Sequence, residues 1–197
     1  MFLNRNNARP YIKDGGFSII ELMVVLAVMG VLLTVAIPAF RNLISDNRLL
    51  SEVYSFRATL NNARTEALTQ RTFVTVCRSS DGASCTGNWN QGYIAFTDFN
   101  GDGVVQPGGP QGDTIIQSKM LDSEFLTITF SNIANRVRFN SNGTALGFGG
   151  VLTICDDRGD TRAKGVAISN QGSVQALSDT DSNGIVNLVG GGDVSCP

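Results

Sequence analysis

The sequence predicts an α+β fold, in which one long N-terminal helix packs on a mostly antiparallel β-sheet head. The run from Phe17 to Pro38 is apolar and carries a single charged side chain, Glu21. An amphipathic stretch follows it, and from Thr72 onward short segments with strand chemistry alternate with Gly, Asn, Asp and Ser clusters. A long helix followed by a run of strands is typical of this class, in which the helix covers one face of the sheet.

The apolar run has the length of a transmembrane helix, and we assign residues 17–40 to it. As a helix it spans roughly 33 Å, which is enough for the hydrocarbon core of a bilayer. Pro38 can kink it, because proline removes one backbone hydrogen bond and clashes with the preceding turn. Basic residues outnumber acidic ones ahead of the run, with Arg5, Arg9 and Lys13 against Asp14. The positive-inside rule therefore predicts a cytoplasmic N-terminus and an exported remainder.

A polar leader, residues 1–16, ends in Gly15-Gly16 directly before the apolar run. A secretory signal peptide has the opposite order, with its cleavage site after the apolar core. Cleavage after Gly16 would therefore remove the leader and keep the helix. A carboxylate such as Glu21 costs about 2.5 to 3.5 kcal/mol at the centre of a bilayer, so it needs a partner there. The alternative is an acid that snorkels to the interface.

At these residues the chain resembles the type IV prepilins and the pseudopilins of type II secretion. The resemblance implies a type IV pilin-like fold and cleavage by a prepilin peptidase between Gly16 and Phe17, followed by N-methylation of Phe17. It also implies that Glu21 pairs with the Phe17 amine of a neighbouring subunit during filament assembly. The expected partners are other minor and major pilins, the peptidase and an inner-membrane assembly platform. The head would be periplasmic before assembly and on the cell surface in a pilus.

Residues 41–71 are expected to continue the membrane helix as an amphipathic helix. Apolar residues recur there mostly at three- or four-residue steps, with charged residues between them. The apolar members are Phe40, Ile44, Val53, Phe56, Leu60, Ala63 and Ala67. A coiled-coil seam would show a similar stripe, and we favour the face on which the sheet of the head packs.

Residues 72–197 are expected to form one globular head rather than two domains. Seven short segments have strand chemistry and end in turn residues, namely 73–77, 92–96, 114–117, 127–130, 137–139, 151–155 and 165–169. Residues 162–169 and 172–176 are typical of a final hairpin. From Arg71 onward the chain has eight Lys or Arg and twelve Asp or Glu residues, a net charge of −4. This charge argues against broad attraction to nucleic acid or anionic lipid.

The four cysteines all lie on the exported side, and an even number there predicts two disulfides in an oxidising compartment. Cys77 and Cys85 enclose a loop short enough to close locally. Cys155 is then left to pair with Cys196, which fastens a glycine-rich tail. A zinc site needs clustered thiols or histidines, and the sequence has no histidine.

The head resembles the minor pilins and pseudopilins of the GspH/FimT type. The similar segments are Val76–Cys85, Trp89, Gly92, Phe96, Asp98 and 100–103, then 137–143, 152–155 and 165–172. Such proteins are implied to enter the filament in few copies, in an initiating or tip complex.

Two segments, 98–103 and 179–184, place oxygen side chains at alternate positions before a glycine, as a calcium loop does. The candidate ligands are Asp98, Asn100, Asp102, Asp179, Asp181 and Asn183. The twelfth positions fall on Gly109 and Gly190, so the bidentate Glu of an EF-hand is missing from both. Plain turns are the favoured interpretation, because Asp and Asn bond their own backbone there. No cofactor is expected apart from this calcium candidate.

No catalytic constellation is visible, so the sequence predicts no enzyme. The favoured hypothesis is a minor pilin that helps to initiate a type IV pilus and lies near its tip, with roles in adhesion or twitching motility. The alternatives are a GspH-type pseudopilin of type II secretion and a DNA-binding minor pilin of natural transformation. The final hairpin turn has no basic residue, and three acids dilute Arg158, Arg162 and Lys164 nearby. That cluster is typical of a solvated loop, which argues against nucleic acid as a partner.

Overall fold

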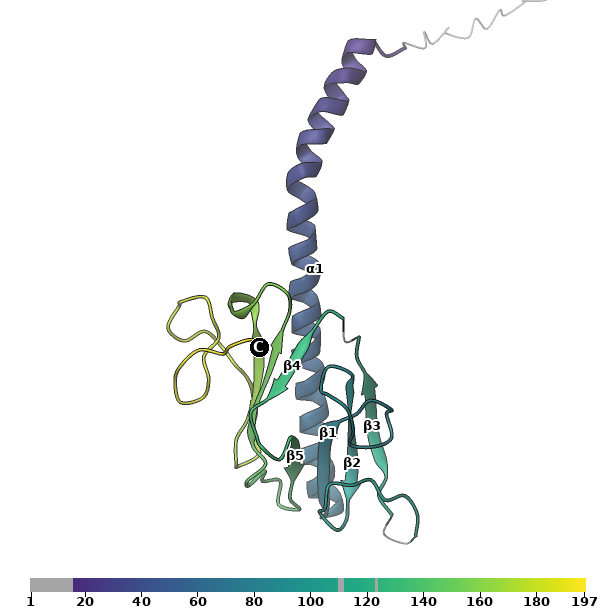
Figure 1. Cartoon of the computed structure of the whole chain (residues 1–197), viewed down its shortest axis with the longest axis vertical. Helices are drawn as coiled ribbons and strands as arrows, with labels where there is room; N and C mark the ends of the chain where they lie inside the picture. The colour runs from purple at the N-terminus through teal and green to yellow at the C-terminus, as the bar shows by residue number, and fades with distance from the viewer. Residues whose placement is uncertain (1–15, 110–111, 123) are drawn as a thin grey trace, which may run out of the picture. The chain divides into compact units, whose positions relative to one another are not determined.

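The computed structural model describes residues 16–109, 112–122 and 124–197. A single long helix, α1 (Ile19–Gln70), precedes all the strands of this part of the chain (Figure 1). The chain divides into two compact units, one up to Leu43 and one over Ile44–Pro197, and the boundary lies inside α1.

The described part of the first unit consists of the N-terminal part of α1 and the three residues ahead of it. Every described residue up to Leu43 is exposed, including the apolar ones. Pro38 lies inside α1, and the helix is assigned without a break through it. The predicted kink at Pro38 stays a prediction.

The second unit begins with the amphipathic part of α1, whose buried face comprises Leu49, Val53, Phe56, Thr59, Leu60, Ala63 and Ala67. Their spacing of three or four residues is the predicted one, and it places them on one side of the helix. Phe40 and Ile44 were expected in the same stripe, but both are exposed. The buried stripe therefore begins at Leu49, about one turn and a half after Ile44.

The strands form two antiparallel sheets of four strands each, where the sequence predicted a sheet without its division. Sheet A has the order β3-β2-β1-β5, formed by Ile115–Met120, Gly92–Asp98, Phe73–Arg78 and Arg136–Phe139. Sheet B has the order β4-β6-β7-β8, formed by Thr127–Phe130, Gly150–Cys155, Lys164–Ile168 and Val174–Ala176. After β3 the chain contributes β4 to sheet B and returns to sheet A for β5.

Both sheets pack against the same part of α1. Val74 and Val76 of sheet A and Leu152 and Ile154 of sheet B belong to one buried cluster with the helix stripe. Phe56 lies at its centre, with its ring centroid 4.3 Å from that of Tyr93 and 6.3 Å from that of Trp89. The second half of α1 is thus the core on which the two sheets meet.

Ion pairs tie both sheet regions to the helix. Lys119 Nζ of β3 lies 2.6 Å from Glu52 Oε2. Arg158, in the turn after β6, places Nη2 2.8 Å from Asp46 Oδ1. The guanidinium also bonds Asp156, which raises the pKa of Arg158. Arg158 therefore stays charged and tethered at any physiological pH.

We predict that Phe56→Ala lowers the free energy of unfolding by about 3 to 5 kcal/mol, because it removes a fully buried aromatic ring and leaves a cavity between the sheets. Tyr54→Ala is the matched control, since Tyr54 is on the same helix and 61% exposed. Denaturant titration of the detergent-solubilised protein, followed by Trp89 fluorescence, measures both. Equal losses for the two variants would contradict the central role of Phe56.

Candidate functional site

The junction at the start of the helix is open in the structure. Gly16 is exposed, and a Cβ built on it meets no atom within 4 Å. Phe17 is 86% exposed. The helix begins two residues later at Ile19, and the N–H of Leu22 already donates to Ser18 O at 3.1 Å. Among the described residues, no side chain covers the bond between Gly16 and Phe17.

Glu21 lies in the first turn of α1, where a negative charge faces the positive end of the helix dipole. No ion pair joins it to another residue of the described segments. Apolar side chains surround it along the helix.

The apolar residues of the first unit form a continuous exposed surface. They include Ile20, Met23, Leu26, Val31, Leu33 and Ile37, each more than 45% exposed. The helix has a mean hydropathy of 2.7 in its most apolar window and is long enough to cross a membrane. Such a surface is stable only against lipid or other helices.

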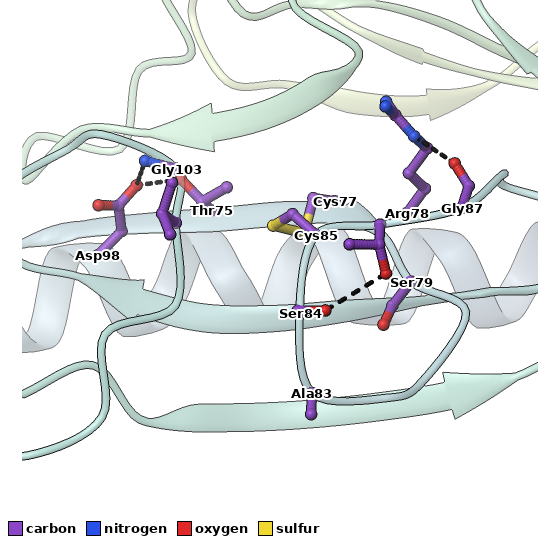
Figure 2. Close-up of a disulfide and its surroundings, with 12 residues drawn as sticks. Thr75, Cys77, Arg78, Ser79, Ala83, Ser84, Cys85, Gly87, Asp98 and Gly103 are labelled. Atoms are coloured by element: carbon purple, nitrogen blue, oxygen red, sulfur yellow. Dashed lines mark hydrogen bonds between the residues drawn. A yellow bond between two sulfur atoms is a disulfide. The ribbon is translucent and has the colours of Figure 1, made fainter.

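The cysteines pair as the sequence predicted. Cys77 on β1 bonds Cys85, with Cα atoms 5.5 Å apart, and Cys155 on β6 bonds Cys196, with Cα atoms 5.9 Å apart. The second disulfide, with Val186 and Val194, anchors the C-terminal tail in a small buried cluster of its own. Figure 2 shows the first disulfide, with Asp98 and Gly103 on one side of it and Arg78 and Gly87 on the other.

Asp81 organises the loop that the first disulfide closes. Its Oδ2 accepts a hydrogen bond from Ser84 Oγ at 2.6 Å, and its Oδ1 accepts from the N–H groups of Ala83 and Ser84 at 2.9 and 2.8 Å. These bonds, that of the Ser84 side chain first, hold the pKa of the Asp81 carboxyl well below its usual range. The loop thus depends on an ionised Asp81.

The first calcium candidate loop makes hydrogen bonds of its own, although Asp98 Oδ1 is buried without a hydrogen-bond partner in the described part of the chain. Asp98 is fully buried, and its Oδ2 accepts from Thr75 Oγ1 at 2.6 Å and from the N–H of Gly103 at 3.1 Å (Figure 2). The guanidinium of Arg136 lies against Gly103, where a Cβ would meet it at 2.5 Å. Hydrogen bonding from the Val104 N–H, with a smaller effect of the Arg136 charge, lowers the pKa of Asp102. A cation would have to compete with that arginine.

In the second calcium candidate loop, acidic side chains also accept hydrogen bonds from the loop itself. Asp179 accepts hydrogen bonds from the N–H groups of Ser182 and Gly184 at 2.7 and 2.8 Å, and the bond from Gly184 is the main cause of its lowered pKa. Asn183 donates to Asp181 at 3.2 Å and to Asp193 at 3.0 Å. In the segments that the structure describes, no three acidic, cysteine or histidine side chains form a metal-binding group. Asx-type turns account for the contacts of both loops, and calcium binding stays an untested prediction.

Two of the three basic residues considered for DNA binding form ion pairs with acids of the same chain. Arg158 is half-buried and bonded to Asp46 and Asp156, and Arg162 lies 3.6 Å from Asp46. The expectation of a solvated loop was therefore wrong for Arg158. The sequence did not predict its partner, because Asp46 lies in α1, more than a hundred residues away.

The sequence also did not predict a set of cation–π contacts on the outer face of sheet A. Arg138 lies 5.1 Å from the ring centroid of Phe73 and 4.0 Å from that of Phe148, and Arg136 lies 5.6 Å from Phe148. The alternation Arg136-Val137-Arg138-Phe139 on β5 was the available signal, because alternate residues of a strand face opposite sides. Val137 and Phe139 face the core, which directs both arginines outward.

A family model described as the type II transport protein GspH matches residues 52–172, more than half of the chain. The chain belongs to the GspH family. The match covers strands β1 to β7 and the buried stripe of α1 from Val53 onward, so it rests on most of the part of the molecule that holds the core. A model of the prokaryotic N-terminal methylation motif matches residues 12–37, of which 12–15 lie outside the described residues. Members of the GspH family are structural pilins and pseudopilins rather than enzymes, and the apolar helix with this motif indicates a membrane-anchored pilin.

Two kinds of known protein are similar to this GspH-family chain. The Pilin-like protein PilA1 of Thermus thermophilus is 34% identical over 101 residues, which are 50% of this chain and 58% of that protein. The chain thus matches less than two thirds of that relative. Two crystal structures of the type IV minor pilin FimU of Pseudomonas aeruginosa share the fold, with TM-scores of 0.51 and 0.50 and identities of 23% and 21%. They cover 67% and 66% of this chain and 90% and 93% of their own.

We predict that Asp81→Asn destabilises the protein at neutral pH, because the amide cannot accept both sets of hydrogen bonds. The pKa of Asp81 is lower in the folded state than in the unfolded chain. The ionised carboxylate therefore stabilises the folded state fully above the unfolded pKa of about 3.9, and this stabilisation is lost as the pH falls below that value. The difference in unfolding free energy between wild type and variant should be constant above about pH 5 and shrink below about pH 4. The control is Asp157→Asn, an exposed carboxylate. A pH-independent difference would contradict this role.

Proposed function

We propose that this protein is a minor pilin of a type IV pilus, which helps to initiate assembly and lies near the filament tip, and so serves adhesion or twitching motility. The observation that carries the proposal is the exposed apolar helix from Phe17 to Leu43 behind an accessible glycine junction. A helix of this kind is stable in a bilayer before assembly and against other apolar helices afterwards. A folded, disulfide-bonded head is then carried on it.

In this proposal the chain has four segments with different roles. Residues 1–16 are a leader removed by a prepilin peptidase, residues 17–40 cross the inner membrane, residues 41–71 continue as the amphipathic helix, and residues 72–197 form a periplasmic head. After cleavage Phe17 becomes the N-methylated first residue. Glu21 then stands four residues away, within reach of the Phe17 amine of a neighbouring pilin. The subunit leaves the membrane through an assembly platform and reaches the cell surface in the pilus.

The choice of a pilus over a type II secretion system rests on the Thermus relative. That relative is a pilin-like protein by name, and its 34% identity over the matched residues exceeds that of the solved structures. The alternative is a GspH-type pseudopilin, and the description of the matching family favours it. Natural transformation ranks third, because two of the arginines near the final hairpin are bonded to acids of the same chain.

Gly16→Ala is expected to leave an unprocessed membrane precursor. The structure has room for a Cβ at this position, so the variant should fold and insert normally, and the defect should lie in recognition by the peptidase. Immunoblotting of whole cells measures the size of the protein. Mature-sized protein in this variant would contradict cleavage at Gly16.

Glu21→Ala is expected to insert and be processed like wild type, because it makes the membrane helix more apolar. Its incorporation into filaments should fall by at least about tenfold, since the neighbouring Phe17 amine loses its counter-charge. Sheared surface filaments are probed for the protein, and total cell content is the control. Undiminished incorporation would remove Glu21 from the proposed role.

Deletion of the gene in its own host distinguishes the three functions. For a type IV minor pilin, surface pili and twitching should be lost while secretion of type II substrates continues. Lost secretion with normal pili would make the protein a pseudopilin. Lost uptake of labelled DNA with normal pili and secretion would instead support the transformation hypothesis.

A further inference from the structure

A pocket of about 370 Å³ lies on the face of sheet B that points away from α1. Val151, Ala167 and Gln175 lie side by side on β6, β7 and β8 and form its floor. Val166 and Val174, each next to one of these residues in the chain, belong to the core around the helix. Because successive side chains of a strand point to opposite faces, the floor of the pocket faces away from the helix.

The C-terminal tail forms one wall of this pocket. Val189 of the tail lines the pocket and is itself 75% exposed. The tail is fixed by the disulfide Cys155–Cys196 and by a β-bridge between Asn187 and Asp193, on either side of Val189. None of the described residues that line the pocket carries a charge, and the others are Gly150, Ile168, Ser169 and Ser173. The pocket is therefore suited to an apolar group rather than to an ion.

Strand β8, which contributes to the floor, is also the edge strand of sheet B. Directly after it, the N–H of Leu177 donates to Gly165 O at 2.8 Å. Alternate residues of an antiparallel strand bond the same neighbour, so Gln175 bonds β7, whereas the N–H and C=O groups of Val174 and Ala176 point to the free edge. In the part of the chain that the structure describes, no backbone group outside the sheet bonds them.

The edge of β8 lacks the features that usually prevent pairing with another chain. Natural edge strands are often blocked by charged side chains or proline, or are covered by another segment. β8 has the sequence Val-Gln-Ala, and both Gln175 and Ala176 are exposed. A free strand edge beside an apolar pocket is the arrangement used in strand addition, in which main-chain hydrogen bonds provide affinity and a pocket provides specificity.

We propose that an extended segment of another filament subunit pairs antiparallel with β8 and places a large aliphatic side chain, such as leucine, in this pocket. Val174 and Ala176 exchange main-chain hydrogen bonds with that segment. The residue opposite Gln175 then lies on the same face of the sheet as Gln175, beside the pocket. The identity of the partner as a filament subunit rests on the proposed function, whereas the strand and its aliphatic side chain follow from the site itself.

A second copy of β8 does not match this site. Self-pairing that satisfies both Val174 and Ala176 would place Gln175 of one copy opposite Gln175 of the other. The polar end of that side chain would lose water beside Val151 and Ala167 without gaining a charged or fixed partner, which is costly. A different chain with an aliphatic residue at the central position avoids this cost.

The test uses the full-length protein in phosphatidylcholine nanodiscs, with its backbone amides observed by NMR. The probe is the peptide acetyl-Lys-Thr-Leu-Thr-Lys-amide, whose threonines favour an extended chain. We expect saturable shifts of the Val174 and Ala176 amide signals. The control peptide has the same charge and carries Asn in place of Leu, and it should bind at least about tenfold more weakly.

Two variants separate the edge from the pocket. Ala176→Pro removes an N–H from the free edge without removing a bond to β7, and Ala167→Leu fills the floor of the pocket. Each should weaken binding of the Leu peptide by at least about tenfold. Ser118→Pro is the matched control on β3, the edge strand of sheet A, because the bond from the Leu121 N–H to Gln91 O places the Ser118 N–H on that free edge. It should leave binding unchanged.

Equal binding of the Leu and Asn peptides, or unchanged affinity in both variants, would overturn the proposal, and so would the absence of any saturable shift. Binding of acetyl-leucine-amide as tight as that of the pentapeptide would indicate a site for small apolar molecules and would contradict a strand. Concentration-dependent shifts of the same amides without peptide, lost in Ala176→Pro, would indicate pairing of two copies and would contradict a different partner.

The dispersion of each variant spectrum reports whether that variant is folded. None of these measurements depends on processing, piliation or secretion, so a failure of this proposal is distinguishable from a failure of the proposed function.

Discussion

The structure of the head depends on the burial of one face of α1 between two sheets. Phe56 and Leu60 are fully buried there, in one cluster with residues of both sheets. Since burial of apolar surface contributes about 25 cal/mol per Å², this stripe is a major stabilising element of the head. Sheet A and sheet B share no strand, so the helix and the aromatic contacts of Trp89 join them.

The same helix therefore has two apolar surfaces. One is buried by the sheets of the same chain, and the other needs an apolar partner from outside it. The stripe from Leu49 to Ala67 is buried within the chain, whereas the apolar residues from Phe17 to Leu43 are not covered by any residue that the structure describes. Lipid and neighbouring apolar helices both supply such a partner. This difference agrees with membership of the GspH family and with a subunit that passes from a membrane into a filament.

Features outside the helix interface act on the outer faces of the sheets. The disulfide Cys155–Cys196 fastens the tail, and Cys77–Cys85 together with Asp81 orders the loop beside β1. The ring of Phe148 contacts the guanidinium of Arg136 on β5 and helps to hold it in position. These contacts order the region around the start of β5 and the end of β1.

The sequence by itself determined the features that arise from local periodicity and short spacing. Glu21 in an apolar run, the stripe from Val53 to Ala67 and the short Cys77–Cys85 loop were all predictable, because each depends on residues a few positions apart. Only the tertiary structure decided the features that depend on long-range closure. The division into two sheets and the pairing of Arg158 with Asp46 join segments far apart in the chain. No local pattern encodes such contacts, since they form only when the whole core packs.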